Sequence, residues 1–177
     1  MPEAFSNSLT RAAGIVSTST GGAVGILTNL VTGISTVDVA INDVIDNQHF
    51  ILGTKVTAVG VASVRCDRDS TITAAATSQN VKFLGVTTAY TSSAKSILVG
   101  GTFANNTTQS VNLSVTVWDN SASTEVSIAG KIPVPNGSSF VISDAGKTVL
   151  ESSDEVRIYC DTANAIDATL SILTGVS

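Results

Sequence analysis

The stretch Val111-Asn112-Leu113-Ser114-Val115-Thr116-Val117 alternates strictly between aliphatic and polar side chains. Successive side chains of a β-strand point to opposite faces of the sheet, so this alternation predicts a strand with one buried face. Valine also favours extended backbone, because its branched Cβ loses rotamer freedom in a helix. We therefore expect this stretch to be a core strand with its aliphatic side chains inside.

Strand-like segments flank this stretch on both sides. Residues 96–103 predict a strand that forms a hairpin with it across a turn at residues 105–108. Downstream, Pro133 and Pro135 lack the amide donors of a central strand, which indicates a sheet edge or a crossover. With later alternating segments, about seven or eight strands are expected, which is typical of a β-sandwich or small barrel. The residues expected to share one face of the first strand are Ile97, Val99, Gly101 and Phe103.

The N-terminal half contains a second group of shorter strand-like segments. Val37, Val39 and Ile41 alternate with polar or small residues, which predicts a half-buried strand. The polar run at residues 67–70 predicts a turn, because Asp and Ser side chains hydrogen-bond the nearby backbone. A small β-module is therefore expected here.

Residues 1–30 carry no sustained period, because a run of small polar residues at 17–22 interrupts any pattern. We expect an extended N-terminal arm, which either docks on a neighbouring protein or stays a flexible tail. The predicted fold is all-β, with two small β-modules of barrel or sandwich type. Its boundaries are 1–30 for the arm, 31–84 for the small β-module, 85–95 for a connector and 96–177 for a β-sandwich module.

The composition narrows the possible partners. Only 13% of the 177 residues are charged, against about a quarter in average proteins, and the net charge is −5. The nine Lys and Arg residues form no cluster, which argues against a nucleic-acid partner. The sequence shows neither a signal peptide nor an apolar window of membrane-spanning length, so no membrane partner is expected. A surface rich in Ser and Thr suits protein contacts, because little charge must be desolvated.

Candidate catalytic and metal-ligating residues are few and scattered. His49 is the single histidine, and no obvious nucleophile lies near it in the sequence. The aspartates on either side of Arg68 fit a solvated turn better than a Ca²⁺ site, because no glycine-centred calcium loop follows. Cys66 and Cys160 are predicted to be free thiols buried at strand positions. We therefore expect no enzymatic activity, no cofactor and no metal site.

Four aromatic residues are candidates for contacts with partners. Trp118 follows the Val111–Val117 stretch on its polar side, where it either caps the core or anchors an interface. Tyr90 and Tyr159 are, with Trp118, the rings that a carbohydrate site would use. Phe5, in the arm, is the fourth interface candidate.

Three segments near the C-terminus share a recognisable pattern. Residues 130–142 contain an Ile-Pro-x-Pro turn followed by Gly-Ser-Ser, residues 147–157 a Val-Leu-Glu strand and an acidic turn, and residues 165–171 an Asp-x-Thr-Leu-Ser strand. This pattern resembles a β-sandwich module of tailed-bacteriophage virion proteins, cyanophage proteins in particular. Residues 43–83 are similar to a small phage β-motif that reads Gly-Asp-x-Val, Gly-Thr-x-Val and a closing Phe. Asn42 stands where that motif has its first glycine.

The resemblance implies a virion structural protein, assembled into the particle in the host cytoplasm. We expect a capsid decoration, or cement, protein that binds the major capsid protein or other virion proteins. It is expected to be a homo-oligomer, with a trimer favoured. A neck, tail or fibre-attachment component is the alternative within the same class. A carbohydrate-binding surface module is the alternative of another class.

Overall fold

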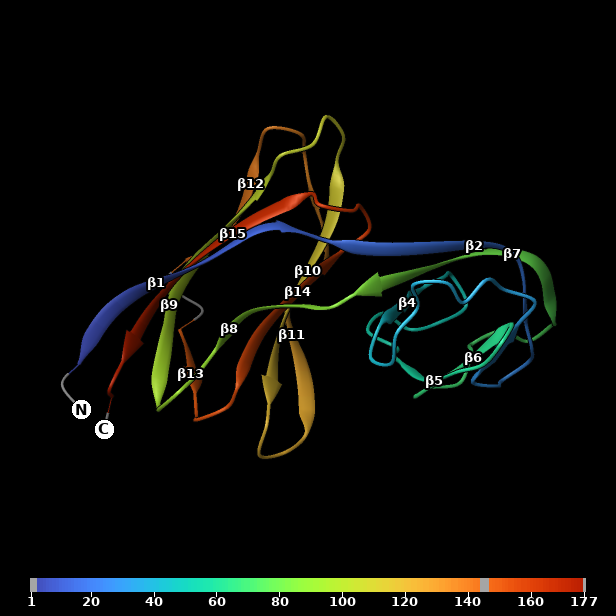
Figure 1. The fold of residues 1–177 in the computed structure, drawn as a ribbon, viewed down its shortest axis with the longest axis horizontal. Helices are drawn as coiled ribbons and strands as arrows, with labels where there is room; N and C mark the ends of the chain where they lie inside the picture. Colours follow the sequence, from blue (N-terminus) through green and yellow to red (C-terminus); the bar gives the residue numbers. More distant parts are fainter. Residues whose placement is uncertain (1–2, 144–146, 177) are drawn as a thin grey trace. The chain divides into compact units, whose positions relative to one another are not determined.

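The computed structural model describes residues 3–143 and 147–176, and these residues form fifteen strands and no helix (Figure 1). Strand accounts for 60% of the chain and is arranged as three antiparallel sheets, which confirms the all-β prediction. The chain divides into two compact units. Unit 1 comprises residues 1–14 and 87–177, and unit 2 comprises residues 15–86.

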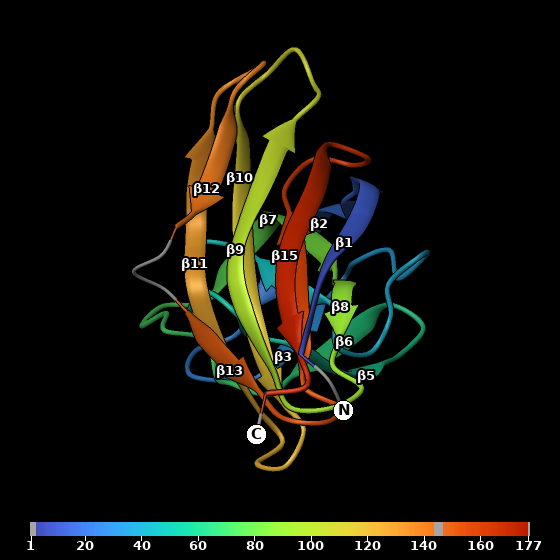
Figure 2. The ribbon, with the colours of Figure 1, turned by 90° about the vertical axis from the view of Figure 1, so that its left-hand side faces the viewer.

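Unit 1 is a sandwich of two antiparallel sheets, here called sheet A and sheet C (Figure 2). Sheet A contains, in spatial order, β1 (Ala4–Ala13), β15 (Ile166–Thr174), β9 (Ser96–Asn105) and β12 (Ser139–Ile142), and β13 (Thr148–Leu150) also pairs with β9. Sheet C contains, in spatial order, β11 (Thr124–Val134), β10 (Val111–Asp119), β14 (Glu155–Cys160) and β8 (Thr87–Thr91).

The two sheets share one hydrophobic core. Leu98 and Phe103 from sheet A and Leu113 and Ile158 from sheet C are each at most 1% exposed within it. Burying a side chain of this size stabilises a fold by about 1.5–3 kcal/mol. The Val111–Val117 stretch is the greater part of β10. Val111, Leu113 and Val115 are buried as the alternation predicts, whereas Val117 is half-buried and Ser114 and Thr116 on the polar face are buried as well.

The predicted edge position of the proline segment is confirmed. Pro133 lies in β11, which is the edge strand of sheet C. Because proline has no amide hydrogen to donate, it is tolerated there and not in a central strand.

Unit 2 is a single six-stranded sheet, called sheet B, with a separate core. The most deeply buried members of this core, each at most 1% exposed, are Val24, Val31, Val56, Val64, Val81 and Phe83. The strands of sheet B, in spatial order, are β4 (Val44–Asp46), β7 (Ala76–Gly85), β2 (Ile15–Val24), β3 (Leu30–Thr32), β6 (Ser63–Cys66) and β5 (Val56–Val59).

The chain enters unit 2 after Gly14 and leaves it before Thr87. Ile15 and Gly85 lie opposite each other in the pairing of β2 with β7, so the two ends of unit 2 are neighbours. Gly14 has a φ of 123°, which side-chain-bearing residues rarely adopt. A Cβ at this position would also collide with the carbonyl oxygen of Thr162. Glycine is therefore required where β1 ends.

The prediction of a separate arm over residues 1–30 is wrong. Its first part forms β1, paired with the C-terminal β15, and its next part forms β2 in sheet B. The backbone is extended as expected, but it belongs to the two units. Strand β1 is not evident in the sequence because its inward positions carry hydroxyl groups instead of aliphatic side chains. Ser8 Oγ, for example, donates to the Ala89 carbonyl oxygen at 2.7 Å.

The predicted boundaries change accordingly. Unit 2 begins at residue 15, so the predicted small β-module of residues 31–84 is only its larger part. The expected connector of residues 85–95 contains strand β8, which belongs to sheet C. The sandwich expected over residues 96–177 also needs β1 and β8 to be complete.

Two local strand predictions are also wrong. Val37 and Ile41 are 70% and 59% exposed in a loop, where Asp38 and Asn42 have φ values of 59° and 74° that a strand cannot contain. Strands β9 and β10 lie in different sheets, so they do not form the expected hairpin.

The face expected for the strand at residues 96–103 is wrong in part. The pairing of β9 with β15 shifts by one residue near Val99. Such a bulge exchanges the two faces of the strand beyond it. Gly101 and Phe103 are buried, whereas Ile97 lies on the opposite, outer face from its buried neighbour Leu98.

Candidate functional site

The outer face of sheet A carries a row of apolar side chains that crosses four strands. Phe5 of β1 lies opposite Leu173 of β15. Ile97 of β9 lies between Leu173 and Val149 of β13. Adjacent residues along each of the inner strands are in the core, so this row points outward. Phe5 is 75% and Val149 is 54% exposed; we call these four residues the apolar row.

The remainder of this face is nearly free of charge. The five strands of sheet A contain two charged residues, Arg11 and Asp167, and both lie toward one end of the face. Leu9 and Val141 add further exposed apolar surface. Because few charges would lose their hydration, another protein can cover such a face at low electrostatic cost.

Sheet C is different, because it carries an ion-pair network centred on Arg157. Arg157 Nε donates to Glu155 Oε2 at 2.7 Å, and Arg157 Nη1 donates to Glu125 Oε2 at 3.2 Å. The same guanidinium lies 4.5 Å from the ring centroid of Trp118. Thr116 Oγ1 donates to the other carboxylate oxygen of Glu125 at 2.6 Å. These contacts pair the charges of Arg157, Glu125 and Glu155 with one another, and Trp118 takes part through a cation–π contact.

The four aromatic interface candidates differ in their exposure to solvent and in their contacts. Tyr159 is 2% exposed and is not a surface residue. Tyr90 of β8 is half-buried and packs against the core of unit 1. Trp118 has Arg157 over its ring, which leaves Phe5 as the candidate on an open apolar face.

Sequence reasoning did not identify the other three members of the apolar row. Leu173, Ile97 and Val149 lie in three strands that are far apart along the chain, and only the register of the pairs aligns them. The signal available in the sequence is the lack of charge in the segments that form sheet A.

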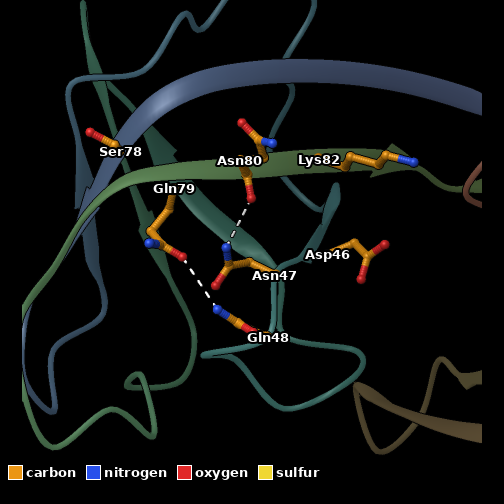
Figure 3. A pocket seen from close by; sticks show the side chains of 7 residues that line it. All are labelled: Asp46, Asn47, Gln48, Ser78, Gln79, Asn80 and Lys82. Carbon is orange, nitrogen blue, oxygen red and sulfur yellow. Dashed lines mark hydrogen bonds between the residues drawn. The ribbon is translucent and has the colours of Figure 1, made fainter.

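Unit 2 contains a shallow polar pocket of about 450 Å³ (Figure 3). Asn47 Nδ2 donates to the Asn80 carbonyl oxygen at 2.9 Å, and Gln48 Nε2 donates to Gln79 Oε1 at 3.5 Å. These amides are of the kind that bind hydroxyl groups, but the lining offers no aromatic ring on which a sugar could stack. The lining residues are Asp46, Asn47, Gln48, Ser78, Gln79, Asn80 and Lys82.

The residues considered for chemistry have local structural contacts. The ring Nε2 of His49 is 3.3 Å from Gln48 Nε2, and the His49 carbonyl oxygen accepts the amide of Thr71 at 2.8 Å. Asp67 Oδ1 accepts the amide of Lys55 at 2.8 Å, a bond between two segments that are 12 residues apart in the sequence. Among residues 3–143 and 147–176, no cluster of three His, Cys, Asp or Glu side chains could hold a metal ion. The same residues include no helix long and apolar enough to cross a membrane.

Both cysteines are free and buried at strand positions, which confirms the prediction. Cys66 lies in unit 2 and Cys160 in unit 1. Burial, with a smaller contribution from the negative charge of Asp67, raises the pKa of the Cys66 thiol to about 12. Burial also raises the pKa of the Cys160 thiol. The nucleophilic thiolate is therefore disfavoured at both positions.

Comparisons with known proteins add little to this description. No family model matches the chain, and no curated protein matches it in sequence. Among solved structures, the chain is similar at 13% identity and a TM-score of 0.25 to an Arthrobacter globiformis isomalto-dextranase complexed with panose. The match covers 90% of this chain and 34% of the enzyme, so the chain spans about a third of that protein. A similarity of this level carries no argument about function.

Proposed function

We propose that the chain is a non-enzymatic structural protein of a tailed-bacteriophage particle, and that it decorates the head shell by binding the major capsid protein through the outer face of sheet A. The observation that carries this proposal is the apolar row on a face that is almost free of charge. The phage context comes from the sequence resemblance in the C-terminal half and in residues 43–83.

The two faces of the sandwich differ in a way that favours sheet A as the docking face. On sheet C, Arg157 already pairs with Glu125 and Glu155, so a partner there would have to cover satisfied charges. Buried ion pairs lose hydration that their attraction does not always restore. The apolar row has no such cost, and its burial removes apolar surface from water.

Copy number in purified particles tests the proposed role. A decoration protein is expected in hundreds of copies spread over the head shell, measured by quantitative mass spectrometry of particles of the phage that encodes the chain. About six or twelve copies would indicate a neck or tail component instead. Absence of the chain from purified particles would overturn the proposal.

Substitution on the face tests the surface. Val149→Lys places a charge at the end of the apolar row farthest from β1, and we expect it to reduce binding to undecorated heads at least tenfold, since buried unpaired charge is costly. Val126→Lys on β11 is the matched control, because Val126 is similarly exposed at 62% but lies on sheet C. Equal binding by both variants would exclude sheet A as the docking face.

A carbohydrate-binding role has less support. Such sites use exposed aromatic rings, and of the three rings considered, Tyr159 is buried and Trp118 is covered by Arg157. Binding of the chain to a glycan array, lost in Trp118→Ala, would favour that role over docking to a capsid.

A further inference from the structure

Strand β1 is an edge strand of sheet A, and within the described residues it pairs with β15 alone (Figure 2). Edge strands expose a row of unpaired amides and carbonyl groups, and proteins usually protect them with proline, lysine or a bulge. The residues from Ala4 to Thr10 have none of these features, and the first irregularity in register lies between Thr10 and Ala13. Over Ala4–Thr10 this edge therefore lacks the usual protection against pairing with another strand.

The outward side chains of β1 include two exposed apolar residues, and a charged residue lies beyond each of them. Phe5 and Leu9 are each 75% exposed, and Asn7 lies between them. Glu3 directly precedes the strand, and Arg11 lies at the start of the irregularity in register after Thr10; both residues are exposed. In the part of the chain that the structure describes, neither Glu3 nor Arg11 has an ion-pair partner.

We propose that two copies of this chain associate by antiparallel pairing of β1 with β1 about a two-fold axis at Asn7. In this register Phe5 of each copy faces Leu9 of the other, and Asn7 faces its own symmetry mate. Glu3 of each copy faces Arg11 of the other. The order Glu3, Phe5, Asn7, Leu9, Arg11 is thus complementary to itself when reversed.

Charge selects this register over the alternatives. A parallel pair would set Arg11 beside Arg11 and Glu3 beside Glu3, and like charges directly opposite each other destabilise a strand pair. An antiparallel pair centred on Phe5 or Leu9 would remove both Glu3–Arg11 contacts. The inward positions carry only Ala4, Ser6, Ser8 and Thr10, so no bulky side chain obstructs the central register.

The contact is closed, because each copy uses the same edge and no free β1 remains. It joins the two copies of sheet A into one continuous sheet, with both apolar rows on the same side. The inference goes beyond the proposed function, since it concerns two copies of the isolated chain and requires no virus particle. A single strand pair is a small interface, so we expect association in the micromolar range that weakens as salt screens the ion pairs.

The first test is a charge exchange followed by sedimentation equilibrium of the purified full chain. Wild type should approach twice the chain mass of 18.0 kDa as its concentration rises to about 100 μM. Glu3→Arg gives arginine at both ends of β1, and Arg11→Glu gives glutamate at both ends. Each variant alone should dissociate about tenfold more readily, because it sets like charges opposite each other at two positions.

Rescue distinguishes this geometry from a general loss of charge. An equimolar mixture of Glu3→Arg and Arg11→Glu should form mixed dimers, and the chain with both substitutions should dimerise as wild type does. The exposed Val126→Lys substitution on sheet C should leave the dissociation constant unchanged. A wild-type chain that stays monomeric or forms trimers, or a mixture that stays monomeric, would overturn the proposal.

Cross-linking locates the axis. In antiparallel pairs opposite Cα atoms are about 4.5–5.5 Å apart, within the range of a disulfide. Asn7→Cys should therefore oxidise to a covalent dimer, whereas Thr169→Cys, exposed on the neighbouring β15, should not. The native cysteines are buried and do not compete. Equal cross-linking of the two variants would also contradict pairing at Asn7.

Discussion

At the scale of single residues, Asp43 is a buried carboxylate that accepts a hydrogen bond from a backbone amide. It is 8% exposed, and its Oδ2 accepts the amide of Ala40 at 2.8 Å. Burial raises the pKa of Asp43 above its usual value, and the hydrogen bond from Ala40 offsets this only in part. The folded state therefore binds the proton of this carboxyl more tightly than the unfolded state does.

Replacement of Asp43 with Asn should make the protein more stable at neutral pH. A raised folded-state pKa means that the contribution of Asp43 is fully present below its unfolded value of about 3.8 and is lost as the pH rises through the folded value. Asp43→Asn keeps an oxygen that accepts the Ala40 amide and does not ionise. Thermal unfolding should show a higher Tm for Asp43→Asn at pH 7 and a difference that shrinks toward about pH 3.

The control for this prediction is Asp69→Asn, because Asp69 is an exposed carboxyl in the same unit. It should leave the Tm unchanged across the same pH range. A stability difference between Asp43→Asn and wild type that does not vary with pH would show that the ionisation of Asp43 has no part in it.

Asn42 lies in a backbone conformation that few side-chain-bearing residues adopt. Its φ is 74°, in the left-handed region that glycine and, among other residues, asparagine tolerate best. Asparagine is therefore compatible with the sharp change of chain direction at this position.

At the scale of elements, the end of β1 depends on Gly14. Gly14→Ala should destabilise unit 1 by more than about 2 kcal/mol, because it combines a strained φ with a collision against the backbone at Thr162. Gly137→Ala is the matched control in the same unit: its φ is 64°, and nothing lies within 4 Å of an added Cβ. Gly137→Ala should lower the free energy of unfolding by only about 1 kcal/mol.

Urea denaturation followed by the fluorescence of Trp118, the single tryptophan, measures both variants. Trp118 lies in β10 and reports on unit 1, which contains both glycines. If Gly14→Ala loses no more unfolding free energy than Gly137→Ala does, the backbone at the end of β1 adjusts to a side chain.

The same element shows how far the sequence predicts the fold. Strand β10 is evident because its inward residues are aliphatic, whereas β1 is hidden because Ser6, Ser8 and Thr10 occupy the inward positions. Alternation reveals which face of a strand is buried but not which strand is its neighbour. For this reason the pairing of β1 with β15, and the placement of β9 and β10 in different sheets, could not be predicted.

The candidate site was predictable only in part, for the same reason. Phe5 is an aromatic residue in a polar segment and was identified from the sequence. The alignment of the other three residues in the apolar row depends on the registers of the strand pairs. The outward position of Ile97 also depends on the bulge in β9, which exchanges the two faces of that strand. A composition poor in charged residues indicates that a face can be covered by another protein, but the position of that face follows from the topology.

At the scale of the whole molecule, unit 2 is an insertion between two strands of unit 1. Unit 1 has its own core, formed by sheets A and C, and unit 2 has another. The ends of the insertion, Ile15 and Gly85, are paired neighbours. Domains with adjacent termini are the ones that tolerate insertion and removal. The two proposed contact surfaces, the apolar row and the β1 edge, both belong to unit 1.

Unit 1 should consequently fold without unit 2. A chain in which an Asn-Gly turn replaces residues 15–86 joins Gly14 to Thr87 across the distance of one strand pair, which such a turn spans. We expect a cooperative urea transition reported by Trp118, because the nineteen buried residues of the unit 1 core are all retained. The shortened chain should also dimerise through β1 with the affinity of the full chain. A soluble shortened chain without a cooperative transition would show that the sandwich needs unit 2 to fold, and a folded but monomeric one would show that unit 2 contributes to self-association.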